Sequence, residues 1–179
     1  MARITYLTAE TAPPTVASTV AKLPPLHVFQ LLAHAESAYR PWLRFGGAIL
    51  ADLALPPLLR ELVILQVGRL AARYEWDQHV PIALAAGATE EQVAALDRGD
   101  LGPFDAAERA VLVFVAAFVR DGEVTDAEYA ALAAAFGERE IVEIALTAAH
   151  YLGLARIMTT LRIDPDDAVG PEGLPAARL

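Results

Sequence analysis

The segment ELVILQVGRLAARYEWDQHVPIALAAG, residues 61–87, decides the fold that this sequence predicts. It has the pattern of two consecutive helices joined near Arg73. At about 100° per residue, Glu61 aligns in the first helix with Leu65, Gly68 and Ala72, which places a carboxylate on an apolar packing face. Burying that charge is costly unless it is paired, whereas a Glu near a helix start can also stay hydrated and favour the helix dipole. The sequence leaves both interpretations open.

Glu75 and His79 are four residues apart in the second helix and therefore share a face, which continues with apolar side chains. A carboxylate beside a histidine can relay a proton, because histidine titrates near neutral pH. Tyr74 and Trp76 flank the pair and could form the walls of a pocket. The alternative is an ordinary ion pair that caps a contact between helices.

We expect helices over almost the whole chain, because capping signals recur and no alternating strand pattern does. Thr89, Asp105 and Thr125 each begin a capping-box pattern. Pro41 is expected to start or bend a helix, and Pro81 to kink one. The expected helices cover about 15–22, 26–38, 41–52, 58–72, 74–87, 89–96, 105–120, 125–136 and 138–161. The prediction is one all-α domain over residues 1–179, with a core at about 25–163 and an irregular tail at 164–179.

Composition excludes several classes of function. The chain has 179 residues, 14 Lys and Arg against 23 Asp and Glu, and a net charge of −9, which argues against a nucleic-acid partner. It has no cysteine, so disulfides, thiolate metal sites and catalytic thiols are excluded. The N-terminus lacks a signal-peptide pattern, and the longest apolar run, 110–119, is shorter than the roughly 20 residues that cross a bilayer. We therefore expect a cytoplasmic protein.

The last predicted helix adds further candidate side chains. Glu143, Thr147 and His150 form a polar stripe in an apolar context, and they either line a cavity or mark its solvent side. Tyr151 and Arg156 could reach a carboxylate substrate. A metal site built from the hairpin carboxylates and the histidines is chemically possible. Its spacing matches neither His-Glu-x-x-His nor Glu-x-x-His, so we expect no metal and no cofactor.

These residues resemble the carboxymuconolactone decarboxylase family, which includes the alkylhydroperoxidase D (AhpD)-like proteins. The marks are Arg60-Glu61-Leu62, Tyr74-Glu75-Trp76, His79 and Ala85-Ala86-Gly87 before a Thr-Glu-Glu cap. The stretch GEREIVEIALTAAHYLGLARIMTTLRI also resembles the closing helix of the family. The resemblance covers about residues 25–163 and implies an AhpD-like helical bundle.

One departure from the family pattern decides the chemistry. Peroxidase members carry Cys-x-x-Cys-x-x-x-His with an upstream Glu. Here His79 matches the His and Glu61 the Glu, but the cysteine positions fall on Ala72 and Glu75. Thiol peroxidase activity is therefore excluded, because it needs a thiolate. Glu75 instead resembles the Tyr-Glu-Trp pattern of cysteine-free, decarboxylase-like members.

The resemblance and the residues together predict a cofactor-free lyase of the carboxymuconolactone decarboxylase type, or a related isomerase or lactone hydrolase. Its substrate would be a small organic acid or lactone. His79 is the expected general acid and base, Glu75 orients and charges it, and Glu61 is a second carboxylate in the relay. The side chains expected to contact the substrate are Tyr74, Trp76, His150 and Tyr151. The alternative is a non-catalytic helical binding or assembly protein, which a filled core beside His79 would favour.

Two further expectations concern geometry and assembly. Glu61 lies about 16 Å along its helix from Ala72, so we expect it to reach His79 only through a kink, a water or a neighbouring element. Helices 110–119 and 138–161 are too apolar for an ordinary surface, which indicates burial in a core or between subunits. We expect a homo-oligomer, and the resemblance implies a trimer or hexamer, with a dimer next. The expected partner is a small molecule, with neither nucleic acid nor membrane.

Overall fold

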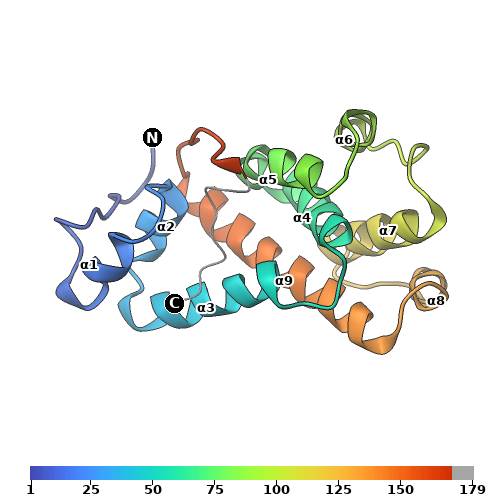
Figure 1. The fold of residues 1–179 in the computed structure, drawn as a ribbon, viewed down its shortest axis with the longest axis horizontal. Helices are drawn as coiled ribbons and strands as arrows, with labels where there is room; N and C mark the ends of the chain where they lie inside the picture. The colour runs from blue at the N-terminus through green and yellow to red at the C-terminus, as the bar shows by residue number, and fades with distance from the viewer. Residues whose placement is uncertain (171–179) are drawn as a thin grey trace.

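The computed structural model describes residues 1–170, and within that range it holds helices and no strands. The predicted all-α, AhpD-like class is therefore confirmed in its secondary structure. Figure 1 shows the helices in chain order. They are α1 Pro14–Val20, α2 His27–Leu32, α3 Glu36–Ala51, α4 Pro57–Ala71, α5 Arg73–Ala85, α6 Glu90–Arg98, α7 Ala106–Arg120, α8 Asp126–Ala133 and α9 Glu138–Leu161.

Local signals explain most helix boundaries. The capping boxes predicted at Thr89, Asp105 and Thr125 are all present, with the side chain of each accepting a backbone N–H three residues on. The expected helix start at Pro41 is wrong, because α3 begins at Glu36 and Pro41 lies inside it; the preceding helix, α2, ends at Leu32. The tail is irregular over 164–169 as expected, and residues 171–179 lie outside the described part.

The α4 helix is the centre of the fold. It packs against α5, α7 and α9, and its residues 61–68 are all buried. Val63, Ile64 and Val67 have no exposed surface and join α7 and α9 in the largest apolar cluster. Figure 1 shows α1–α3 at one end of the elongated molecule and α6–α8 at the other, with α4, α5 and α9 between them. A polar side chain on α4 is therefore forced to find its partners inside the protein.

The α4–α5 hairpin is held together by an unusually close crossing. A Cβ built on Gly68 would lie 2.7 Å from the backbone nitrogen of Trp76, closer than real Cβ atoms approach. Glycine is thus required at this position for its lack of a side chain. The two helices can approach closely at the crossing, and this approach fixes the relative placement of the polar residues on either side of it.

The apolar α9 helix is mainly a core element. It is long and apolar enough to cross a membrane by length and composition, but half of that window is buried inside the protein. Its contacts with α4 account for the burial, as in any core helix. Val142, Leu146 and Ile157 remain exposed on its outer side. The predicted homo-oligomer stays a prediction, and this face of α9 is the surface on which it rests.

We predict that Gly68→Ala destabilises the protein by about 1–3 kcal/mol, because the added methyl group forces α4 away from α5. The matched control is Gly153→Ala on α9, where an added Cβ meets nothing within 4 Å. This control should gain about 0.5–1 kcal/mol from helix propensity. Urea unfolding of both variants checks the prediction, and a Gly68→Ala variant as stable as the wild type would contradict the close crossing.

Candidate active site

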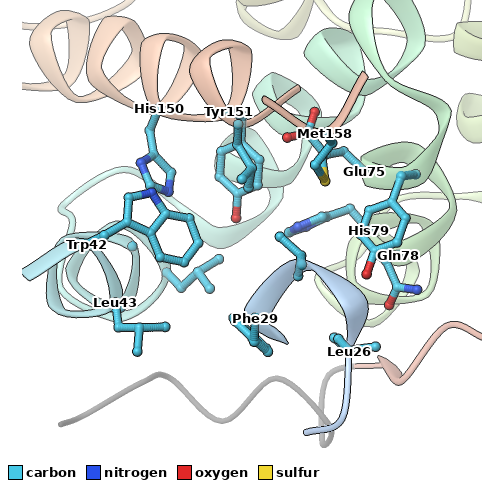
Figure 2. Close-up of a pocket in the computed structure, with 16 residues that line it drawn as sticks. Leu26, Phe29, Trp42, Leu43, Glu75, Gln78, His79, His150, Tyr151 and Met158 are labelled. Atoms are coloured by element: carbon cyan, nitrogen blue, oxygen red, sulfur yellow. The ribbon is translucent and has the colours of Figure 1, made fainter. Parts of the chain in front are cut away.

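A cavity of about 80 Å³ lies beside His79, between α2, α3, α5 and α9. By volume it accommodates a few waters or a small organic molecule. Figure 2 shows its side chains converging from four helices, with His79 and Tyr151 directed at its centre. The lining residues are mostly apolar: Leu26, Val28, Phe29, Trp42, Leu43, Gly46, Gly47, Leu50, Tyr74, Glu75, Gln78, His79, His150, Tyr151, Leu154 and Met158. The lining residues on α2 and α3 belong to no sequence motif, so they could not be predicted from the sequence.

His79 is oriented by Glu61, which lies behind it and does not line the cavity. The Nδ1 of His79 is 2.8 Å from Oε2 of Glu61, and the Nε of Arg60 donates to Oε1 of the same carboxylate at 2.9 Å. Burial alone would raise the pKa of Glu61, but His79 and Arg60 outweigh it and hold that pKa below its ordinary value. Because the ionised carboxylate can only accept, Nδ1 carries the hydrogen of this bond. The other ring nitrogen, Nε2, is left for the cavity.

The direct contact between Glu61 and His79 corrects the expectation that a kink, a water or a neighbouring element must connect them. Measured from the Gly68–Trp76 crossing, Glu61 is seven residues away on α4 and His79 three residues away on α5. The axial offset is therefore only about 6 Å, which the two side chains span. The distance of about 16 Å between Glu61 and Ala72 overstates the separation of Glu61 and His79. His79 is displaced from the turn in the same direction as Glu61, so the two side chains lie closer to each other than to the turn.

Glu75 does not pair with His79, although the two are four residues apart on α5. Its side chain is 3% exposed, and both carboxyl oxygens are without a hydrogen-bond partner among the described residues. Burial raises the pKa of Glu75 well above its ordinary value. The expected role of Glu75 in charging and orienting His79 is thus not supported. The structure gives the orienting contact to Glu61 and leaves Glu75 as a buried acid at the cavity.

Aromatic ring contacts connect the two histidines that line the cavity, His79 and His150. Tyr151 meets His79 edge-on at 5.1 Å between ring centroids, and His150 meets Tyr151 edge-on at 5.3 Å. Trp42 stacks on His150 at 5.4 Å. Burial lowers the pKa of His150 to about 4, so this imidazole is neutral at pH 7. Both residues expected on α9, His150 and Tyr151, therefore lie at the cavity, as Figure 2 shows.

Tyr74 and Trp76 differ from their expected place as a pair of pocket walls. Tyr74 lines the cavity, but its hydroxyl donates to Asp166 of the C-terminal segment and is not free for a ligand. Trp76 does not line the cavity. It is buried in a separate cluster with Leu62 and Leu96, and Arg73 lies over its ring. Residues two positions apart on a helix point about 200° apart, which is why Tyr74 faces the cavity and Trp76 the core.

The cavity offers no positive side chain to a ligand. Among the lining residues, which all belong to the described part of the chain, there is no Arg or Lys. The nearest guanidinium in the polar network, Arg60, already donates to Glu61 and to the Leu50 carbonyl. Burying a carboxylate here would leave its charge uncompensated, at a cost of several kcal/mol. The arrangement suits an uncharged molecule.

Comparison with known proteins agrees with the resemblance. Residues 36–117 match the model of the carboxymuconolactone decarboxylase family, so the chain is similar to this family over that segment, and it contains no cysteine. A search of curated proteins finds no match.

Solved structures share the fold at low identity. An uncharacterized peroxidase-related protein with an AhpD core, from Ralstonia eutropha, has a TM-score of 0.78 and 20% identity over 99% of this chain and 97% of that chain. The debrominase Bmp8, solved with a cysteine replaced by alanine and with 2,3,4-tribromopyrrole, has a TM-score of 0.76 and 19% identity over 99% and 96%. A peroxidase-related protein from Silicibacter sp. has a TM-score of 0.69 and 19% identity over 78% and 76%. These likenesses establish the AhpD-like fold.

We predict that Glu75 makes the folded protein less stable as the pH rises. The folded chain keeps the Glu75 proton at pH values where the unfolded chain, with a carboxyl pKa of about 4.3, has lost it. The folded state then binds more protons, so the contribution to stability falls between the unfolded and the folded pKa, by about 1.4 kcal/mol per pH unit. Glu75→Gln, which resembles the protonated side chain, removes this dependence.

Urea unfolding between pH 4.5 and 8 measures the effect. The free energy of unfolding of Glu75→Gln should increase relative to that of the wild type as the pH rises above about 4.5. Glu123→Gln, at an exposed position, is the matched control and should show a constant difference. A constant difference for Glu75→Gln as well would mean that Glu75 is ionised in the folded protein.

Proposed function

We propose that the protein is a cofactor-free enzyme that transfers protons on a small, uncharged lactone or similar apolar molecule. One observation carries the proposal: an oriented histidine base and an unpaired buried carboxylic acid line the same apolar cavity. His79 is fixed by Glu61, whose pKa is held below its ordinary value, whereas burial raises the pKa of Glu75 well above its ordinary value. Two titratable groups with opposed pKa shifts are the usual arrangement for a base and an acid in one reaction.

The roles follow from the positions of the groups. Nε2 of His79 removes a proton from the carbon next to the lactone carbonyl, and Glu61 stabilises the imidazolium that forms. Glu75 donates its proton to the substrate at the far end of the unsaturated system. The electron pair of the broken C–H bond moves into the unsaturated system of the ring. The new C–H bond forms at the carbon that Glu75 protonates. His79 then returns its proton to Glu75 through the product or water, so that the net reaction is an isomerisation.

The charge of the cavity favours a lactone over an organic acid. Decarboxylation, the reaction implied by the family name, would bring a carboxylate to a cavity that no Arg or Lys lines. An uncharged ring avoids that desolvation cost. The debrominase neighbour was solved with 2,3,4-tribromopyrrole, which is also small and cyclic. This supports the size and polarity class of the ligand and leaves the reaction to experiment.

A non-catalytic helical binding protein is the alternative function. It would be favoured by a filled core beside His79, and the cavity at that position instead favours the enzyme. Glu61 and Arg60 are buried at a cost that packing alone does not require, because an apolar pair of similar size would fill the same space. This cost supports a chemical role for the pair.

We predict that the protein accelerates the interconversion of α- and β-angelica lactone, an uncharged butenolide pair, and that His79→Gln lowers this rate by about 10²-fold or more. Glu75→Gln should lower it by a similar factor. Glu61→Gln should lower kcat and shift its pH profile, because Glu61 acts through His79. NMR in D₂O follows both the isomerisation and deuterium incorporation.

The matched control is His34→Gln, at an exposed histidine outside the cavity, which should leave the rate unchanged. Muconolactone, which carries a carboxymethyl group on the same ring, should react more slowly than angelica lactone. Wild-type rates equal to buffer on both lactones would reject the enzyme in favour of the binding protein. Faster turnover of muconolactone would restore the organic acid as the substrate class.

A further inference from the structure

A second, more open cavity is separate from the one beside His79 and shares no lining residue with it. It measures about 470 Å³ and is bounded by the C-terminal ends of α4 and α6, by α7 and by α8. In Figure 1, α6, α7 and α8 form the right-hand part of the molecule, and α4 lies toward its centre. Three arginines line it: Arg69, Arg98 and Arg120. We call it the arginine groove.

The three guanidinium groups are not neutralised by carboxylates of the described residues. Arg60, Arg73 and Arg139 each have a carboxylate partner within 4.0 Å, whereas no arginine of the groove has one within residues 1–170. Burial lowers the pKa of Arg69, the charge of Arg120 lowers it further, and Asp97 opposes both. Like charges therefore gather here in a protein whose net charge is −9, which is an arrangement that a bound anion would stabilise.

Arg69 is held in place by the buried side chain of Gln66. Gln66 is 2% exposed, and its Nε2 donates to the Leu112 carbonyl at 2.8 Å while its Oε1 accepts from the Nε of Arg69 at 2.9 Å. The other two guanidinium nitrogens of Arg69 remain for the groove. Gly99, at a φ of +77°, lies close enough that an added Cβ would be 3.3 Å from Nη1. Arg69 is thus fixed before any ligand arrives.

The acidic residues of the groove are accounted for in part by other contacts. Glu128 caps α8, where its carboxylate accepts from the backbone and hydroxyl of Thr125. Asp97, on the neighbouring surface of α6, pairs with Arg73 at 2.8 Å. Asp121 lines the groove at the end of α7. Three cations therefore face two carboxylates, of which one is committed to its helix cap.

We propose that the arginine groove binds the phosphate group of a small phosphate ester. Arginine forks match the oxygens of phosphate, and three of them suit a tetrahedral dianion better than a single planar carboxylate. Leu101, Leu112 and Val113 line the same groove and provide an apolar wall for the organic part of the ester. The site is separate from the His79 cavity, so it stands or falls independently of the proposed enzyme activity.

Calorimetric titration of the full chain with inorganic phosphate and with phenyl phosphate tests the proposal, at an ionic strength held constant with NaCl so that screening is equal. Both should bind, and phenyl phosphate should bind more tightly because of the apolar wall. Arg69→Gln and Arg120→Gln should each weaken binding by about tenfold or more. Arg44→Gln, at an exposed arginine on α3, is the matched control and should change it less than about twofold.

Three outcomes would overturn the proposal. The wild type could bind neither compound, or the groove variants could bind as the control does. Light scattering could also show that Arg120→Gln changes the oligomeric mass while phosphate has no effect, which would make the groove a contact between copies of the chain. Because Arg120 is exposed, this variant is expected to fold, and circular dichroism checks that it does.

Discussion

The hydrogen bond between Nδ1 of His79 and the buried carboxylate of Glu61 is the interaction on which the site depends. Glu61 is 0% exposed in the central helix, so its charge persists only because Arg60 pairs with it and His79 hydrogen-bonds to it. The contact requires α4 and α5 to cross closely, and the bare backbone of Gly68 permits that approach. The fold and the chemistry thus share one constraint, since the crossing that packs the hairpin also aims the imidazole at the cavity.

Glu75 differs from Glu61 because its carboxyl group has no hydrogen-bond partner among the described residues. The pKa of Glu61 is lowered because its carboxylate has two partners, whereas the pKa of Glu75 is raised because its carboxyl group has none among the described residues. Both side chains are buried to a similar degree, so the difference comes from hydrogen bonds and charge and not from exposure. A base and an acid are therefore available at one pH, without a metal or a thiol being required for either.

Much of this arrangement could be predicted from sequence, because local rules govern it. The capping boxes, the α4–α5 hairpin and the choice of Glu61, Glu75 and His79 all follow from spacing and periodicity. The partner of His79 could not be predicted in this way, because helix spacing favoured Glu75 and only the crossing at Gly68 brings Glu61 closer. The cavity walls from α2 and α3 and the arginine groove depend on contacts between residues far apart in the chain, which leave no local pattern.

The tautomer of His79 tests the central claim most directly. Long-range ¹H–¹⁵N NMR of uniformly labelled protein, with the His79→Gln variant to assign the signal, distinguishes the two ring nitrogens. With the ring neutral, the account predicts that Nδ1 carries the hydrogen shared with Glu61 and that Nε2 is unprotonated. Replacing Glu61 by Gln should remove this preference. A neutral ring protonated at Nε2 in the wild type would contradict the account, because His79 could not then act as a base toward the cavity.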